Sequence, residues 1–131
     1  MLKDQLVGTW RLVTLVTERA DGVTTHPYGP RAAGIFLFDV DGNFSVQLMN
    51  PDRSGENVDG YAAFWGDYHV DEVEQAFTLV PTASLIPAMI GMPTERHVAF
   101  SDGSAVFTPP PQLVDGIEAQ TFITWRKISG S

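Results

Sequence analysis

A tyrosine in the segment 61–70 is the first side chain of this sequence that could do chemistry. The segment reads YAAFWGDYHV, and strand alternation puts Phe64 and Tyr68 on one face and Asp67 and His69 on the other. Because Asp67 and His69 favour water, we expect Phe64 and Tyr68 to face the interior. A buried Tyr68 hydroxyl could donate to a ligand carbonyl or supply a proton in enol chemistry. The alternative is a core tyrosine whose hydroxyl the protein itself satisfies.

Gln47 and Arg96 are the other two polar candidates. In the segment 43–50, Gln47 and Met49 alternate with an apolar row, and the sequence leaves open which row faces the interior. Facing inward, Gln47 would offer a donor and an acceptor to a bound molecule, and Met49 would offer a deformable wall. An interior Arg96 would need a partner, which either a carboxylate of the protein or an anionic ligand group could supply.

The sequence offers little for metal binding, nucleotide binding or covalent catalysis. It has no cysteine, and its three histidines are far apart, at His26, His69 and His97. No thiolate site and no site of closely spaced histidines is therefore predicted. The sequence also lacks a P-loop, a GxGxxG motif and a nucleophile elbow. We expect no metal and no cofactor.

Charge limits the partners of this protein. Sixteen Asp and Glu residues against eight Lys and Arg residues give a net charge of −8. Nucleic acids and anionic membrane surfaces attract basic proteins, so neither is expected as a partner. The N-terminus does not resemble a signal peptide, and no apolar stretch is long enough to span a bilayer. These features predict a soluble, cytoplasmic protein.

A hairpin over residues 34–53 is the strongest structural signal. Asp41-Gly42 joins two apolar runs, and a tight turn needs a positive φ, which glycine adopts easily. Pro51 ends the second run because it lacks a backbone donor. Including this hairpin, eight runs have strand character: residues 8–17, 33–40, 43–50, 61–70, 75–80, 94–100, 104–108 and 118–127.

These eight short strands, mostly joined by tight turns and without a convincing long helix, predict an all-β fold. We expect one domain over residues 1–131, an eight-stranded antiparallel up-and-down barrel with a short helical turn at residues 2–6. Closing such a sheet removes its exposed edges and leaves room for one small ligand.

The connecting segment 81–93 is unusually apolar and is interrupted by proline and glycine. A lid that includes Met89 would make the mouth of the barrel hydrophobic and would contact an apolar ligand. The alternatives are a loop packed flat on the outside of the barrel, or a contact between two copies of the chain. A homodimer is therefore also open.

Five stretches of the chain resemble the small lipocalin-like domain of bacteria and fungi: LVGTWRLV, GIFLFDVDGNFSVQLMNPDR, GYAAFWGDYHVD, IGMPTERHVAF and the terminal TWRK. The resemblance covers nearly the whole chain. It implies a lipocalin-like barrel that holds a small apolar or amphipathic molecule, and some relatives act in natural-product biosynthesis. It also implies that Trp10, in the Gly-x-Trp motif, packs at the closed end of the barrel, and that Arg96 matches the arginine of the family. Where relatives often carry a histidine, this chain reads Gln75-Ala76-Phe77-Thr78, so no role of that histidine carries over.

Three functions from different classes remain as hypotheses. The first is a binding or carrier protein, with ligand contacts from Trp10, Phe64, Tyr68, Gln47, Met49 and Met89. The second is a cofactor-independent isomerase or cyclase that orders a polyketide-like or polyene-like substrate. Its catalytic residues would be Tyr68, Arg96 and Gln47, which would polarise a carbonyl. The third is a structural or partner-binding β protein without a ligand.

Overall fold

The computed structural model describes residues 1–53 and 59–130. Its elements, in chain order, are α1 (Leu2–Leu6), β1 (Gly8–Arg19), β2 (Thr24–Thr25), β3 (Ala33–Phe38), β4 (Asn43–Met49), β5 (Tyr61–Asp71), β6 (Ala76–Ser84), the 3-10 turn η1 (Pro87–Met89), β7 (Thr94–Ser101), β8 (Ser104–Thr108), β9 (Gln112–Val114) and β10 (Ile117–Ser129). Strands dominate because β-branched and aromatic residues recur at alternate positions along most of the chain.

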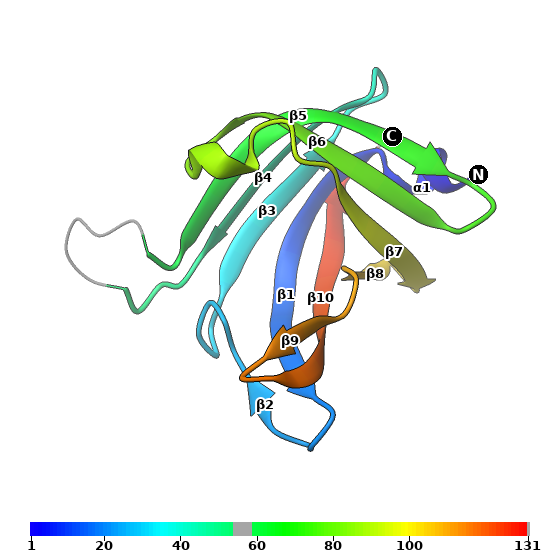
Figure 1. Ribbon diagram of the computed structural model, residues 1–131. Helices are drawn as coiled ribbons and strands as arrows, with labels where there is room; N and C mark the ends of the chain where they lie inside the picture. The colour runs from blue at the N-terminus through cyan, green and yellow to red at the C-terminus, as the bar shows by residue number, and fades with distance from the viewer. Residues whose placement is uncertain (54–58, 131) are drawn as a thin grey trace.

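The main strands pair antiparallel in the order β1–β3–β4–β5–β6–β7–β8–β10, and β10 pairs back with β1. Within the described residues this closes a barrel of eight antiparallel strands (Figure 1). The predicted up-and-down barrel with a short N-terminal helical turn is therefore confirmed. The short strands β2 and β9 extend the sheet as partners of β1 and β10.

The predicted hairpin is formed by β3 and β4, and its turn is built around Asp39. The carboxylate of Asp39 accepts hydrogen bonds from the backbone N–H of Asn43 at 2.8 Å, the side-chain amide of Asn43 at 2.9 Å and the backbone N–H of Asp41 at 2.9 Å. These bonds, chiefly those from Asn43, lower the pKa of Asp39. Gly42 has a φ of 93°, the conformation that the Asp-Gly pair predicts. The turn thus aligns the hairpin.

The strand β6 differs from the sequence-based prediction of a strand over 75–80 that ends before Pro81. It continues past Pro81, because a β-bulge beside Trp65 and Gly66 shifts the register and sets Pro81 opposite Gly66. A bulge tolerates proline, since the ladder is locally interrupted there. Gly66 provides the space, because a Cβ at this position would overlap the carbonyl oxygen of Val80.

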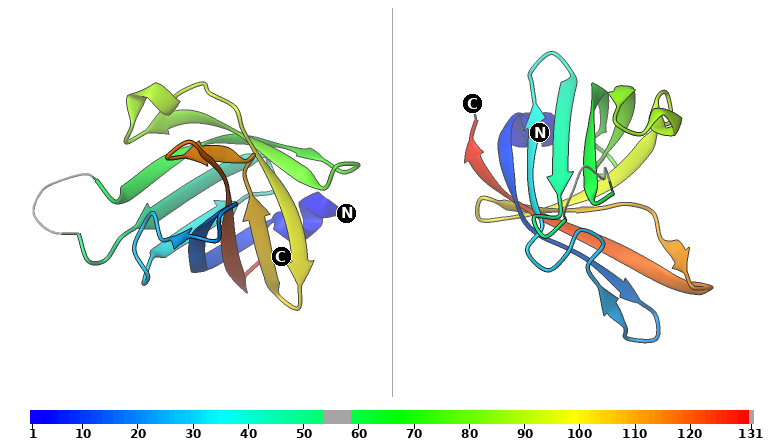
Figure 2. Two further views of the ribbon diagram at one scale, coloured as in Figure 1. Left: turned by 60° about the horizontal axis from the view of Figure 1, so that its bottom comes forward. Right: turned by 90° about the vertical axis from the view of Figure 1, so that its left-hand side faces the viewer.

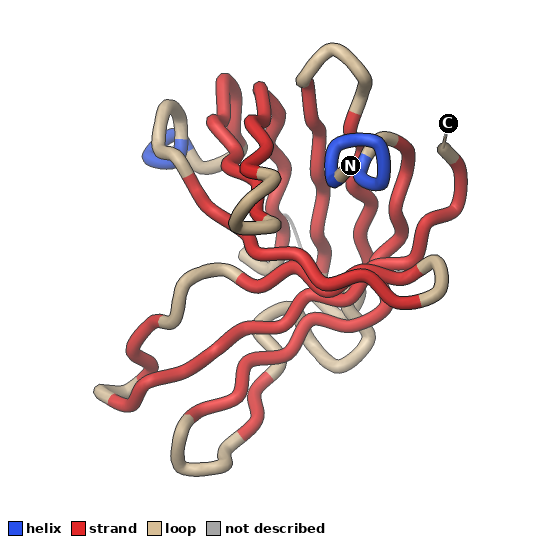
Figure 3. Tube along the Cα trace, turned by 90° about the vertical axis from the view of Figure 1, so that its right-hand side faces the viewer, coloured by secondary structure: helices blue, strands red, loops and turns tan. Residues whose placement is uncertain are grey.

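One end of the barrel is closed by α1 and filled with aromatic rings. The side chains of Leu2 and Leu6 are fully buried, and the indole N–H of Trp10 donates to the carbonyl of Leu6 at 2.8 Å. Trp10 therefore packs at the closed end, as its motif implies. The rings packed together in this half are Trp10, Phe36, Phe38, Phe77, Phe107 and Trp125. Figure 3 shows α1 beside the N-terminus and well apart from η1.

The opposite end of the barrel is bordered by connections rather than by a helix. The segment that contains η1 lies there, together with the connection between β2 and β3 and the two hairpins that carry β2 and β9. In Figures 1 and 2 these two hairpins project beyond the barrel from the same end. We call this the open end.

Candidate functional site

A pocket of about 300 Å³ lies at the open end of the barrel. Its lining comes from connections far apart in the sequence: Pro27, Tyr28, Asp59, Gly60, Tyr61 and Ile86. Tyr28 packs against the core from the connection between β2 and β3, and its burial raises the pKa of its hydroxyl. Because Tyr61 begins β5 and Ile86 precedes η1, the pocket lies at the rim of the barrel mouth. The Tyr61 side chain belongs to the outer row of β5, where its hydroxyl donates to Gln47.

The segment 81–93 lies at this mouth with some apolar side chains packed inward and others exposed. Met89 of η1 packs against the core, and its sulfur lies 3.7 Å from the hydroxyl oxygen of Ser84. Ile86, Ile90 and Met92 are exposed instead. The segment therefore lies at the rim with apolar side chains on both its inner and outer surfaces, and its action as a lid remains a prediction.

The inner wall below the mouth is mainly apolar. Its buried side chains come from several strands and include Leu15, Leu48, Ala62, Phe64 and Leu79. Phe64 faces inward, as alternation along β5 predicts, and its ring meets that of Phe44 edge-on at 5.8 Å. Such a wall suits the apolar part of a small molecule.

Arg96 places a cation on this inner wall. Along β7, half-buried residues alternate with exposed ones, and Arg96 belongs to the half-buried row, opposite the buried Phe77 of β6. Burial lowers the pKa of its guanidinium. The group donates to the backbone carbonyl of Glu95 at 2.9 Å, and it forms no ion pair with any carboxylate of the described residues. The carboxylate that could have balanced Arg96 structurally is therefore absent from the described part of the chain.

Threonines add three hydroxyls to the buried polar groups of the barrel. Thr17 of β1 and Thr121 of β10 face each other with their hydroxyl oxygens 2.8 Å apart, so they satisfy one another. The hydroxyl of Thr94 on β7 is buried and has no hydrogen-bond partner within the described residues. An unpaired buried hydroxyl costs free energy, which a ligand could recover.

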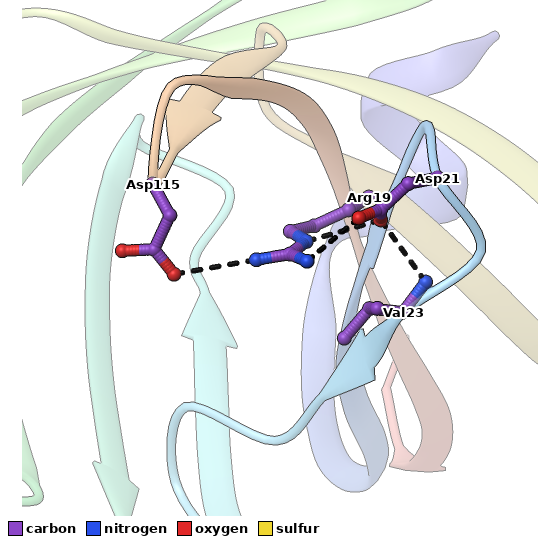
Figure 4. Close-up of polar contacts among 4 residues, drawn as sticks. All are labelled: Arg19, Asp21, Val23 and Asp115. Atoms are coloured by element: carbon purple, nitrogen blue, oxygen red, sulfur yellow. Dashed lines mark hydrogen bonds and ion pairs between the residues drawn. The ribbon is translucent and has the colours of Figure 1, made fainter.

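Arg19 is a second half-buried arginine, at the end of β1, and it makes its contacts where the hairpins of β2 and β9 project beyond the barrel. Its Nη2 and Nε contact the two carboxylate oxygens of Asp21 at 2.7 and 3.1 Å, and its Nη1 lies 3.3 Å from Asp115 (Figure 4). Asp21 also accepts the backbone N–H of Val23 at 3.2 Å. The bond from Arg19 is the main cause of the lowered pKa of Asp21. The contacts tie the hairpins of β2 and β9 together.

Tyr68 faces inward and is buried, as predicted, but it lies at the closed end of the barrel. Its hydroxyl donates to the backbone carbonyl of Asp39 at 2.6 Å, and its ring meets Phe38 edge-on at 5.0 Å. Burial, followed by the charge of Asp39, raises the pKa of Tyr68. The hydroxyl is thus used by the β3–β4 turn, and the structure does not bring it together with Arg96.

Gln47 and Met49 lie on the outer row of β4, so the inward option for this row is wrong. The larger apolar row of Phe44, Val46 and Leu48 occupies the interior. The Gln47 side chain is exposed and accepts a hydrogen bond from the hydroxyl of Tyr61 at 3.2 Å. The interior contacts predicted for Gln47 and Met49 are therefore not formed, and the set Tyr68, Arg96 and Gln47 is divided among three places.

The described residues hold no group of three or more histidine, cysteine, aspartate or glutamate side chains placed to bind a metal ion. In the same part of the chain, no helix combines the length and the apolar character needed to cross a membrane.

Comparison with known proteins identifies the barrel. A family model described as a lipocalin-like domain matches residues 7–128. The chain belongs to the lipocalin-like family. A solved structure of an uncharacterised protein from Bacteroides eggerthii DSM 20697 is similar to this lipocalin-like domain, with a TM-score of 0.50 and 17% sequence identity. The match covers 93% of this chain and 98% of that one, and it supports the fold alone.

One curated protein is also similar in sequence to the lipocalin-like chain. The L-xylulose/3-keto-L-gulonate kinase of Escherichia coli (strain K12) is 32% identical over 78 residues. These residues are 60% of this chain but 14% of the kinase, so the chain spans a small part of its relative. The kinase activity belongs to that whole protein.

Sequence reasoning missed Tyr28 and Thr94 as residues of the lipocalin-like site. Thr94 could have been found from its spacing, because it lies two residues before Arg96 and therefore shares its strand face. Tyr28 lies in a connection without periodicity, and the sequence carries no signal that it packs at the mouth.

Proposed function

We propose that this lipocalin-like protein binds a small, largely apolar organic molecule in the open half of its barrel. The observation that carries the proposal is the mouth pocket, which is lined by Tyr28, Tyr61 and Ile86 at the end opposite α1. The apolar inner wall below it supports the same function, because ligand sites combine apolar walls with a few polar groups. We place binding without turnover ahead of catalysis, because the predicted catalytic residues do not lie together at one site.

Binding of the neutral dye N-phenylnaphthylamine tests this function, because the dye brightens in apolar surroundings. We expect saturable fluorescence with one molecule bound per chain. Ile86→Glu should weaken dye binding about tenfold, because it places a charge at an apolar mouth. A tenfold change corresponds to a loss of about 1.4 kcal/mol in binding free energy. Val73→Glu is the control, because Val73 is also an exposed apolar residue but lies in the turn before β6, away from the pocket lining.

Two results would overturn the proposed function. One is the absence of saturable dye binding by folded protein. The other is equal weakening by Ile86→Glu and Val73→Glu, which would place the bound dye away from the mouth.

The natural molecule can be sought by native mass spectrometry of the protein purified from its own organism. We expect a stoichiometric apolar or amphipathic metabolite that is released on denaturation. Incubating that molecule with fresh protein then separates carriage from catalysis, since an isomerase or cyclase would return a changed compound. Such a molecule, if it came from a natural-product pathway, would also support the biosynthetic role.

A further inference from the structure

We propose that Arg96 and Thr94 form an anchor for a carboxylate, so that the molecule held in the barrel is an amphipathic carboxylic acid. The inference deepens the proposed function and rests on it. It names the chemical class of the ligand and the two side chains that would select it.

The first observation is the position of Arg96 on the inner wall without a countercharge. A guanidinium taken out of water needs an anionic partner or a full set of acceptors to offset its lost hydration. Arg96 has five N–H donors, and the acceptor it meets among the described residues is the carbonyl of Glu95. The other donors of the guanidinium meet no acceptor among the described residues.

Arg19 provides the comparison within the same barrel. That arginine is held by two carboxylates, those of Asp21 and Asp115, although the described residues offer Arg96 none. The chain has sixteen acidic residues, so carboxylates are not scarce. An inward arginine without a carboxylate partner among the described residues is therefore a place where an anion from outside would be stabilised.

The second observation is the hydroxyl of Thr94. It is buried and lacks a partner in the described part of the chain, and it lies two residues from Arg96 on the same strand face. Both residues pair with inward positions of β6, Thr94 with Leu79 and Arg96 with Phe77. A hydroxyl donor and a guanidinium side by side suit the two oxygens of one carboxylate.

The rest of the ligand is defined by what surrounds this pair. Leu79 is the buried neighbour of Thr94 across the β6–β7 ladder, and Leu48 and Phe64 supply further apolar surface on the inner wall. Met89 packs against the core from the rim, and methionine adapts its shape to flexible chains. A carboxylate at Arg96 with an apolar body directed to these residues is an amphipathic acid.

Competition against the bound dye tests the anchor with three probes that share one apolar chain: dodecanoate, dodecanol and dodecyl phosphate. With wild-type protein we expect dodecanoate to bind at least tenfold more tightly than dodecanol. Dodecyl phosphate should bind more weakly than dodecanoate, because two donors suit a planar carboxylate. Equal affinity for dodecanoate and dodecanol would overturn the inference, and tighter binding of dodecyl phosphate would overturn the assignment to carboxylates.

Variants assign the effect to the two side chains. Arg96→Met removes the charge at similar length and should remove the preference for dodecanoate while leaving dodecanol affinity unchanged. Arg96→Lys should restore part of the preference, because it restores charge without the planar fork. Thr94→Val keeps the shape and removes the hydroxyl, and it should reduce dodecanoate affinity severalfold. Arg126→Met, at an exposed position of β10, is the control and should change neither affinity.

Failure of this inference and failure of the proposed function give different results. N-phenylnaphthylamine has no acidic group, so wild-type protein that does not bind the dye refutes the binding function itself. Dye binding without a dodecanoate preference, or a preference that survives Arg96→Met, refutes the carboxylate anchor alone. Thermal unfolding of each variant confirms folding, and we expect Arg96→Met to unfold at or above the wild-type temperature because it removes a desolvated charge.

Discussion

The role of a polar residue in this barrel depends on which hydrogen-bond and ion-pair partners the fold places beside it. Tyr68 and Arg96 both face inward, but the hydroxyl of Tyr68 is bonded to the carbonyl of Asp39, whereas Arg96 meets no carboxylate within the described residues. Tyr68 therefore has a structural role, whereas Arg96 could still bind a ligand, although the sequence made both of them candidates for the same site.

Tyr68→Phe should change how stability depends on pH. Because the folded pKa of Tyr68 lies above its unfolded value near 10, the folded state holds this proton more tightly. The stability from this group is present below about pH 10 and is lost as the pH rises through the folded pKa. Removing the hydroxyl should cost about 1 kcal/mol at neutral pH through the lost bond to Asp39.

Urea unfolding at steps from about pH 7 to about pH 11 measures this effect. The wild-type free energy of unfolding should fall more steeply above about pH 10 than that of Tyr68→Phe, and the two slopes should coincide below about pH 9. An equally steep alkaline fall in both proteins would show that Tyr68 does not contribute.

Among the elements, β6 shows how one glycine permits a strand to pass a proline. The bulge opposite Pro81 depends on the absence of a side chain at Gly66, where a Cβ would overlap the backbone of Val80. The end of β6 then leads into η1 and the apolar rim. The position of the rim thus depends on a local irregularity at the middle of β5.

Gly66→Ala should destabilise the protein by roughly 3 kcal/mol, the upper range for overpacking, because rigid backbone must move. Gly116→Ala is the control, since a Cβ there meets open space and costs only the strain of its φ of 78°, about 1 kcal/mol. Urea unfolding measures both. Equal losses in the two variants would mean that the bulge yields easily.

For the whole molecule, a net charge of −8 surrounds a site that is proposed to take an anion. Long-range repulsion should slow the approach of a carboxylate, while the short-range attraction of half-buried Arg96 holds it once bound. Overall charge and local charge therefore act in opposite directions.

The association rate of dodecanoate should rise a few fold when salt is raised from about 10 mM to about 150 mM, because salt screens distant charges most. The rate for dodecanol should stay constant. Stopped-flow displacement of N-phenylnaphthylamine measures both rates. A dodecanoate rate that falls with salt would mean that local attraction governs the approach as well.

The sequence by itself determined the barrel, because alternation and tight turns are local signals. The Asp41-Gly42 pair predicted the β3–β4 hairpin, and the polar neighbours of Tyr68 predicted its inward face. Alternation along β4 could not show which of its two rows faces the interior, because the row of Gln47 and Met49 was also a plausible inner face. The packing of both rows against neighbouring strands settles the orientation. The outward side chain of Gln47 follows from the packing of the larger row beneath it.

Only the tertiary structure decided where a ligand could bind. The mouth pocket joins Tyr28, Tyr61 and Ile86, which no periodicity connects. Ion pairing is equally non-local: Arg19 meets Asp115 across 96 positions, whereas Arg96 meets no carboxylate in the described part of the chain. A strand pattern specifies which face a residue takes, but the partner across the barrel depends on register and closure, which bring distant segments together.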